Sequence, residues 1–140
     1  MVVIFFAVLL VVICTIIHYE VLYSMSNRLA RMVGKGRKRV LLSVLGAIVA
    51  HQLQIIVFSL GYYLLLGFGR YGSLEGEFSR SLLDTSYYSF VVYTSLGFGD
   101  ITPVGPIRFM TNLETVTGLV MIAWTASFLF MQMQKYWNEE

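Results

Sequence analysis

The residues best suited to chemistry form one short run, residues 94–100 (TSLGFGD), which lies between two long apolar segments. Gly97 and Gly99 flank Phe98, and glycine reaches backbone conformations that other residues avoid, so successive carbonyl groups can point to the same side of the chain. A row of carbonyl oxygens can replace the water around a monovalent cation. A hydroxyl residue precedes the glycines, and the carboxylate of Asp100 follows them. The run therefore predicts a cation-binding stretch of backbone.

The composition is that of a membrane protein. Of the 140 residues, 57% are hydrophobic and 13% are charged, and the mean hydropathy is +0.72. A soluble domain has about a quarter charged residues, so we expect the apolar surface to face lipid in one membrane domain. The lone Cys14 excludes an intrachain disulfide, and with only His18 and His51 beside it we expect no multi-ligand metal site and no cofactor.

Three segments are long and apolar enough to cross a bilayer as helices. The first runs from about residue 2 to 23 and lacks the leading basic residue and small-residue cleavage pattern of a signal peptide, so we expect it to be retained. The second runs from about 40 to 66 and the third from about 106 to 134. This divides the chain into an N-terminal transmembrane helix (1–24), a basic loop (25–39) and a further membrane domain (40–140).

Charge sets the expected orientation. The segment between the first two spans carries six basic and no acidic residues, so the positive-inside rule predicts that it is cytoplasmic. The N-terminus and residues 67–105 then lie outside, and the C-terminus lies in the cytoplasm beside Lys135. We expect a multi-pass protein of the cell membrane whose partners include lipids. Nucleic acid is not expected, because the basic residues cluster where a membrane protein places them: Arg28, Arg31, Lys35, Arg37, Lys38 and Arg39.

The outer segment contains a second element. Residues 67–80 begin with a glycine-rich, polar stretch and are predicted to form a loop, whereas residues 81–94 are apolar and aromatic but too short to span. We expect a re-entrant helix over 81–94, because irregular backbone at membrane depth is tolerated only where protein buries it or where it lines a wet cavity. The alternative is an ordinary outer loop with a hydrophobic patch.

The run at 94–100 resembles the potassium-channel filter signature, Thr-Val-Gly-Tyr-Gly-Asp, and residues 40–134 resemble the two-helix pore module of small prokaryotic potassium channels. Thr102-Pro103, Arg108 and Gly118 match the family's run into its inner helix. The first span lies outside the resemblance; added to the two-helix module, it gives an expected all-α membrane protein with three transmembrane helices, a re-entrant pore helix and an extended filter at 95–99. The resemblance also implies a homotetramer, because four filter strands are needed to surround an ion.

The resemblance assigns roles to individual residues. K⁺ as the permeant ion would bind at Ser95, Leu96, Gly97 and Phe98, within a filter that includes Thr94 and Gly99. Asp100 would guard the outer mouth, Tyr87 and Tyr88 would support the filter, and Gly118 would be a hinge. As an ionisable residue within the third span, Glu114 is a further candidate for filter support. On the same span four residues recur at one-turn spacing and are expected to line the cavity, the alternative being that they pack on a neighbouring helix: Leu119, Ile122, Ala126 and Phe130.

Three positions depart from the commonest family pattern. Ser95 replaces a threonine, Leu96 a valine and Phe98 a tyrosine, so Phe98 cannot make the hydroxyl hydrogen bond that helps to hold the filter open. The expected function is a potassium-selective channel with no enzymatic activity. The alternatives are a non-selective monovalent cation channel on the same scaffold and a non-conducting membrane subunit.

Several polar residues within the spans allow two interpretations. Glu114 bonds either the pore helix or Arg108, or reaches interfacial water. His51 either senses pH or makes a hydrogen bond between helices, and we favour the bond. We expect His18 and Glu20 to be an interfacial pair near the cytoplasmic end of the first span, and Cys14 to be a packing residue. A seam of mostly small residues on the second span is expected to pack against the third: Ser43, Ala47, Ala50, Gln54, Val57 and Gly61.

Overall fold

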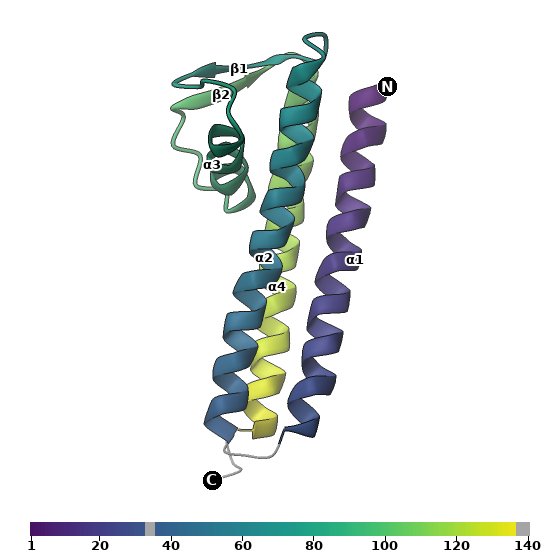
Figure 1. Cartoon of the computed structure of the whole chain (residues 1–140), viewed down its shortest axis with the longest axis vertical. Helices are drawn as coiled ribbons and strands as arrows, with labels where there is room; N and C mark the ends of the chain where they lie inside the picture. Colours follow the sequence, from purple (N-terminus) through teal and green to yellow (C-terminus); the bar gives the residue numbers. More distant parts are fainter. Residues whose placement is uncertain (33–35, 137–140) are drawn as a thin grey trace.

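The computed structural model describes residues 1–32 and 36–136, which form three long helices, one short helix and a small two-stranded sheet (Figure 1). In chain order the elements are α1 (Val2–Arg31), α2 (Gly36–Gly67), β1 (Ser73–Gly76), α3 (Leu82–Tyr93), β2 (Ile101–Val104) and α4 (Ile107–Tyr136).

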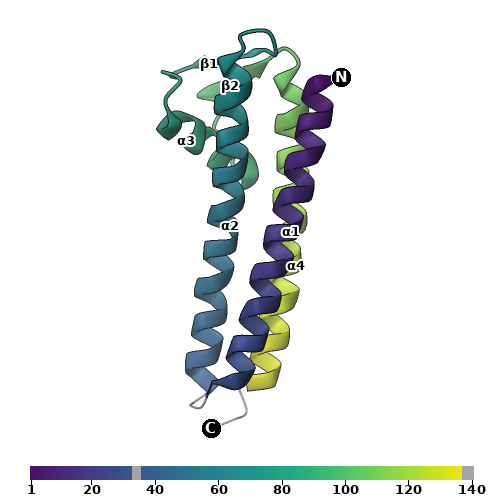
Figure 2. The same cartoon turned by 45° about the vertical axis from the view of Figure 1, so that its right-hand side comes forward.

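The three long helices α1, α2 and α4 are each long and apolar enough to cross a membrane. A helix rises about 1.5 Å per residue, so 30 residues extend about 45 Å and exceed the ~30 Å of hydrocarbon. The helices pack side by side along their length (Figures 1 and 2), and much of their apolar surface faces outward. This is the exposure expected of helices that are solvated by lipid.

The two ends of the molecule differ in character. The N-terminus lies at the same end as the sheet, and the last turn of α1 and the first turn of α2 lie at the opposite end (Figure 1). The predicted basic loop is mostly helical, since α1 continues to Arg31 and α2 begins at Gly36. Arginine and lysine are good helix formers, and Arg28 and Arg31 in the last turn of α1 interact favourably with the negative end of its dipole. Lys35 lies outside the described residues.

The predicted outer loop also contains regular structure. Strand β1 pairs with β2 in antiparallel register, from Ser73 opposite Val104 to Gly76 opposite Ile101. The pairing brings together the chain just before α3 and the chain just after residues 95–100. The β1–β2 pair therefore fixes both ends of the segment that carries the candidate cation-binding run.

The main apolar core lies in the half of the helix bundle nearest the sheet. It joins Leu10 of α1, Phe58 and Tyr62 of α2, Tyr88 of α3 and Met110 of α4. The small-residue seam of α2 is buried apart from Val57, which is half-buried. The seam faces more than the predicted neighbour, because at Gly61 an added Cβ would meet Leu10 and Phe6 of α1 as well as Met110 of α4.

Candidate cation-binding site

The short helix α3 leads into the candidate run and begins with a side-chain cap. The hydroxyl of Ser81 accepts a hydrogen bond from the backbone N–H of Asp84 at 3.0 Å. The Asp84 carboxylate in turn accepts from both the hydroxyl and the backbone N–H of Ser79. These hydrogen bonds, with the Ser79 hydroxyl contributing most, lower the pKa of the Asp84 carboxyl. The first turn of α3 is thus held by its own sequence neighbours.

The backbone of residues 95–99 alternates in handedness. Ser95, Gly97 and Gly99 have positive φ angles of 55°, 56° and 80°, while Leu96 and Phe98 between them do not. A left-handed conformation is unusual for a serine, and alternation along consecutive residues turns successive peptide groups toward one side of the chain. The structure therefore has the backbone alternation that a row of carbonyl ligands requires.

One side of this extended segment, which we call the filter strand although it is not part of a sheet, is exposed in the single chain. Leu96 is 54% and Phe98 66% exposed, and a Cβ added to Gly97 or Gly99 would meet no atom within 4 Å. Behind the strand lies a hollow of about 280 Å³, whose lining comes from α3, residues 95–103 and α4: Tyr88, Val91, Val92, Ser95, Gly97, Gly99, Ile101, Pro103, Thr111 and Thr115.

The two tyrosines predicted to support the filter lie in different places. Tyr87 is partly exposed, and its hydroxyl donates to the Asp100 carboxylate at 2.7 Å, which raises the pKa of the Tyr87 phenol. Tyr88 is buried against Tyr62, ring edge to ring face, with its hydroxyl 3.0 Å from that of Thr111. The structure thus brings Tyr87 to the outer carboxylate and directs Tyr88 into the contact between α2 and α4.

Glu114 bridges α4 to two other helices. It is completely buried, and it accepts hydrogen bonds of 2.5 Å from Ser89 of α3 and from Tyr62 of α2. The interpretation in which this carboxyl reaches interfacial water is wrong, because no part of the side chain is exposed. Of the alternatives from the sequence, the bond to the short helix is the one that forms.

Gly118 lies at a close approach between α4 and α3. A Cβ at this position would overlap the backbone of Tyr93, including its carbonyl oxygen. Helix α4 runs through this predicted hinge without a break. The residues predicted to line a cavity follow on an exposed side of α4, where Leu119 is 52% and Ile122 42% exposed and Ala126 is also exposed.

The sequence interpretation missed a buried polar group in the middle of the bundle. His18 is completely buried and contacts Gln54 and Thr125, so the expectation that it forms an interfacial pair with the exposed Glu20 is wrong. The physical reason is that α1 extends to Arg31, which moves His18 away from the end of the helix. The sequence did contain a signal for this buried group, because several of the apolar spans each carry a polar side chain.

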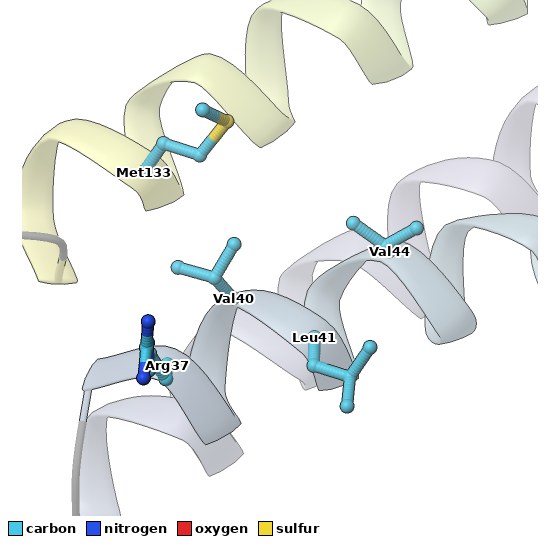
Figure 3. A pocket seen from close by; sticks show the side chains of 5 residues that line it. All are labelled: Arg37, Val40, Leu41, Val44 and Met133. Carbon is cyan, nitrogen blue, oxygen red and sulfur yellow. The ribbon is translucent and has the colours of Figure 1, made fainter.

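A second hollow, of about 340 Å³, lies at the opposite end of the molecule (Figure 3). Its walls are mostly apolar and come from α2 and α4, and it contains none of the residues predicted to bind a cation: Arg37, Val40, Leu41, Val44 and Met133.

Comparison with known protein families identifies a match over more than half of the chain. Residues 50–135 match the family model described as an ion channel. The match starts in the middle of α2, includes α3 and the whole of the 95–99 strand, and ends within the last turn of α4. No curated protein and no solved structure matches the chain.

Proposed function

The chain belongs to the ion channel family, and on this premise we propose that it conducts K⁺ passively across the cell membrane through a filter formed by residues 95–99 of four identical chains. The observation that carries the proposal is the alternation of positive φ at Ser95, Gly97 and Gly99. Such a strand, repeated around an axis, presents rings of carbonyl oxygens that replace the hydration shell of a potassium ion.

Four chains are proposed because one strand cannot surround an ion. The exposed, apolar Leu96 and Phe98 and the exposed side of α4 at Leu119 and Ile122 are the surfaces that a tetramer would use around its axis. In this arrangement the α4 residues border the cavity on the inner side of Ser95. The hollow behind the filter strand would face a neighbouring chain.

Charge favours a cation at both ends of the proposed filter. Asp100, held by Tyr87 at the exposed end of the strand, would raise the local concentration of cations at the outer mouth. Helix α3 ends at Tyr93, two residues before Ser95, and the C-terminal end of a helix carries a partial negative charge. A cation that has passed the filter would therefore lie near the favourable end of four such helices.

The molecule crosses the membrane, in this proposal, with the sheet outside and the end that carries Arg28, Arg31 and Lys135 in the cytoplasm. The basic residues at that end support this orientation by the positive-inside rule. They would also contact the anionic lipid headgroups of the inner leaflet.

A flux assay tests the proposal. The full chain is purified and reconstituted in liposomes, and barium-sensitive K⁺ flux is measured together with reversal potentials in mixed K⁺ and Na⁺. We expect K⁺ flux and a reversal potential close to that of K⁺. A reversal potential that does not change when K⁺ is exchanged for Na⁺ would instead assign a non-selective cation channel. The absence of flux would assign a non-conducting subunit.

Two glycine variants make the assay specific. Gly97→Ala should abolish flux, because it adds a side chain to a residue at φ 56° within the filter. Gly69→Ala is the matched control, since Gly69 also has a positive φ (66°) and open space around it, but lies in the loop after α2. If Gly97→Ala conducts as well as the parent protein, the filter assignment is wrong.

A further inference from the structure

Five polar side chains form a closed ring of hydrogen bonds in the interior of the bundle. We call His18, His51, Gln54, Tyr93 and Thr125 the polar ring. Going around it, the Gln54 amide nitrogen lies 2.7 Å from Nδ1 of His18, and Nε2 of His18 lies 3.2 Å from the Thr125 hydroxyl. That hydroxyl lies 3.0 Å from Nε2 of His51, whose Nδ1 lies 2.9 Å from the Tyr93 hydroxyl. Tyr93 closes the ring by donating to the Gln54 carbonyl oxygen at 2.6 Å.

Each of the five contacts of the polar ring pairs one donor with one acceptor. The Gln54 amide nitrogen can only donate, so Nδ1 of His18 accepts and its Nε2–H donates to Thr125. The Thr125 hydroxyl then donates to His51, which donates through Nδ1–H to Tyr93. With both histidines uncharged, each of the five groups donates once and accepts once. Removing any one group leaves a donor and an acceptor unpaired on its two neighbours.

The polar ring is shielded from its surroundings. His18, Gln54, Tyr93 and Thr125 are buried, and His51 is half-buried. The Trp124 ring packs on His18 with centroids 5.1 Å apart. In so apolar an environment, hydrogen bonds are strong and an unpaired polar group is costly.

One member of the polar ring, Tyr93, lies at the start of the proposed filter. Tyr93 is the last residue of α3 and lies two residues before Ser95. Its side chain is held by Gln54 and His51, and its backbone lies directly against Gly118 of α4. The position of Tyr93 therefore sets where the filter strand begins.

One member of the polar ring comes from α1, which lies away from α3 with α2 between them (Figure 1). The other four members fall within residues 50–135, the part that matches the ion channel family, whereas His18 falls outside it. Helix α1 packs along α2 and α4, and packing alone needs only apolar side chains. A buried histidine that completes a ring leading to Tyr93 is a feature that packing does not explain.

We propose that His18 is a positioning residue for the filter, and that α1 acts on the pore by closing the polar ring that holds Tyr93. This inference rests on the proposed function, because it assigns His18 an effect on a filter at residues 95–99. His18 itself does not contact the ion path. It fixes Gln54 and Thr125, and these fix Tyr93 directly and through His51.

The test compares single and double variants of the full chain in planar bilayers. Permeability ratios of K⁺ to Na⁺ and the fraction of time open are measured for His18→Phe, Tyr93→Phe and the double variant. Each single variant should change at least one of these two quantities by about fivefold or more. About fivefold is the lower end of the range that is typical for coupling between two sites. The double variant should change it no more than the larger single change, because both substitutions break the same ring.

Matched controls separate positioning from packing. Like His18→Phe, Thr15→Val removes a polar group from α1. The Thr15 hydroxyl, however, donates to the backbone of its own helix at Val11, so the permeability ratio and the fraction of time open should stay as in the parent protein. Thr125→Ser keeps the hydroxyl of the polar ring and should behave as the parent protein does, whereas Thr125→Val should reproduce the defect. If His18→Phe does not fold, the comparison of Thr125→Ser with Thr125→Val tests the inference in its place, by the same permeability ratio and fraction of time open.

Two results would overturn the inference. One is parent-like permeability ratios and open times in His18→Phe or, where that variant does not fold, in Thr125→Val, even if its unfolding temperature falls. The other is a double variant whose effect is the product of the two single effects. Failure of the proposed function gives a different result, namely a parent protein that does not conduct or a Gly97→Ala variant that conducts normally.

Discussion

The two ends of α3 are held in opposite ways. At its start, Ser81 and Asp84 are hydrogen-bonded to each other, and Asp84 to Ser79, so every one of these bonds joins residues within five positions of each other, and none is fully buried. At its end, Tyr93 is buried and bonded to Gln54 and His51 of α2, about forty positions away. One end is fixed by its own sequence and the other by the whole bundle.

This difference bears on how the geometry of the proposed filter is set. Residues 95–99 follow the end of α3 that depends on long-range contacts. A lost surface cap is replaced by water, whereas a lost buried partner leaves a polar group in an apolar interior. We therefore expect substitutions to have larger effects toward the end of α3 than toward its start, and the following variants test that gradient.

The largest effect is expected at Gly118, beside the end of α3. In Gly118→Ala the new Cβ overlaps the Tyr93 backbone, which has no rotamer by which to move aside. Overpacking of this kind costs about 1–3 kcal/mol, and K⁺ flux should fall with it. The measurement is thermal or denaturant unfolding in detergent, together with the flux assay.

The control for Gly118 is Gly46→Ala on α2. There the added Cβ would meet only the flexible side chain of Met25, which can turn away. Equal stability of the two alanine variants would show that the backbone at the end of α3 can move away from a side chain added at Gly118.

A smaller effect is expected in the middle of α3, where Ser89 and Tyr62 both donate to Glu114. Tyr62→Phe removes one of these donors and should lower the free energy of unfolding by about 1.5 kcal/mol. Tyr63→Phe alters the next residue, which is exposed, and should leave stability unchanged. Equal losses in the two variants would show that the Glu114 contact adds nothing beyond general packing.

At the start of α3 we expect a loss of about 0.5 kcal/mol for Ser81→Ala, the low end for a helix cap because this one is only half-buried. Ser81→Asp should retain the stability of the parent protein, since aspartate caps as well as serine does. The measurement is again the free energy of unfolding. A loss as large as that of Gly118→Ala would reverse the gradient.

The smallest effect is expected for Ser79→Ala and concerns pH. Hydrogen bonds from Ser79 lower the pKa of Asp84 in the folded chain, so their stabilisation is present above the ordinary pKa of about 3.9 and is lost as the pH falls through the lowered value. Ser79→Ala should raise the pKa of Asp84 toward its ordinary value, which NMR titration of this carboxyl can detect. Stability near neutral pH should change little. An unchanged pKa would show that Ser79 does not stabilise the carboxylate.

The same contrast explains what the sequence could predict. The predicted helix at 81–94 agrees with Leu82–Tyr93 to within a residue at each end, because caps such as Ser81 act locally. The pairing of Ser73–Gly76 with Ile101–Val104 was not predicted, since such short strands carry little periodicity. His18 was misplaced because its role depends on Gln54 and Thr125, which no local pattern connects to it.

The β1–β2 pair has a consequence for protein engineering. Because Gly76 and Ile101 are register partners, residues 77–100 leave and re-enter the rest of the protein at one point. Residues 77–100 can therefore be exchanged as a unit, because both of their ends are attached at the same place. A chimera that receives the corresponding segment of another channel should keep its register at this attachment, and compatibility should then depend on whether the incoming segment supplies a tyrosine where Tyr93 meets Gln54.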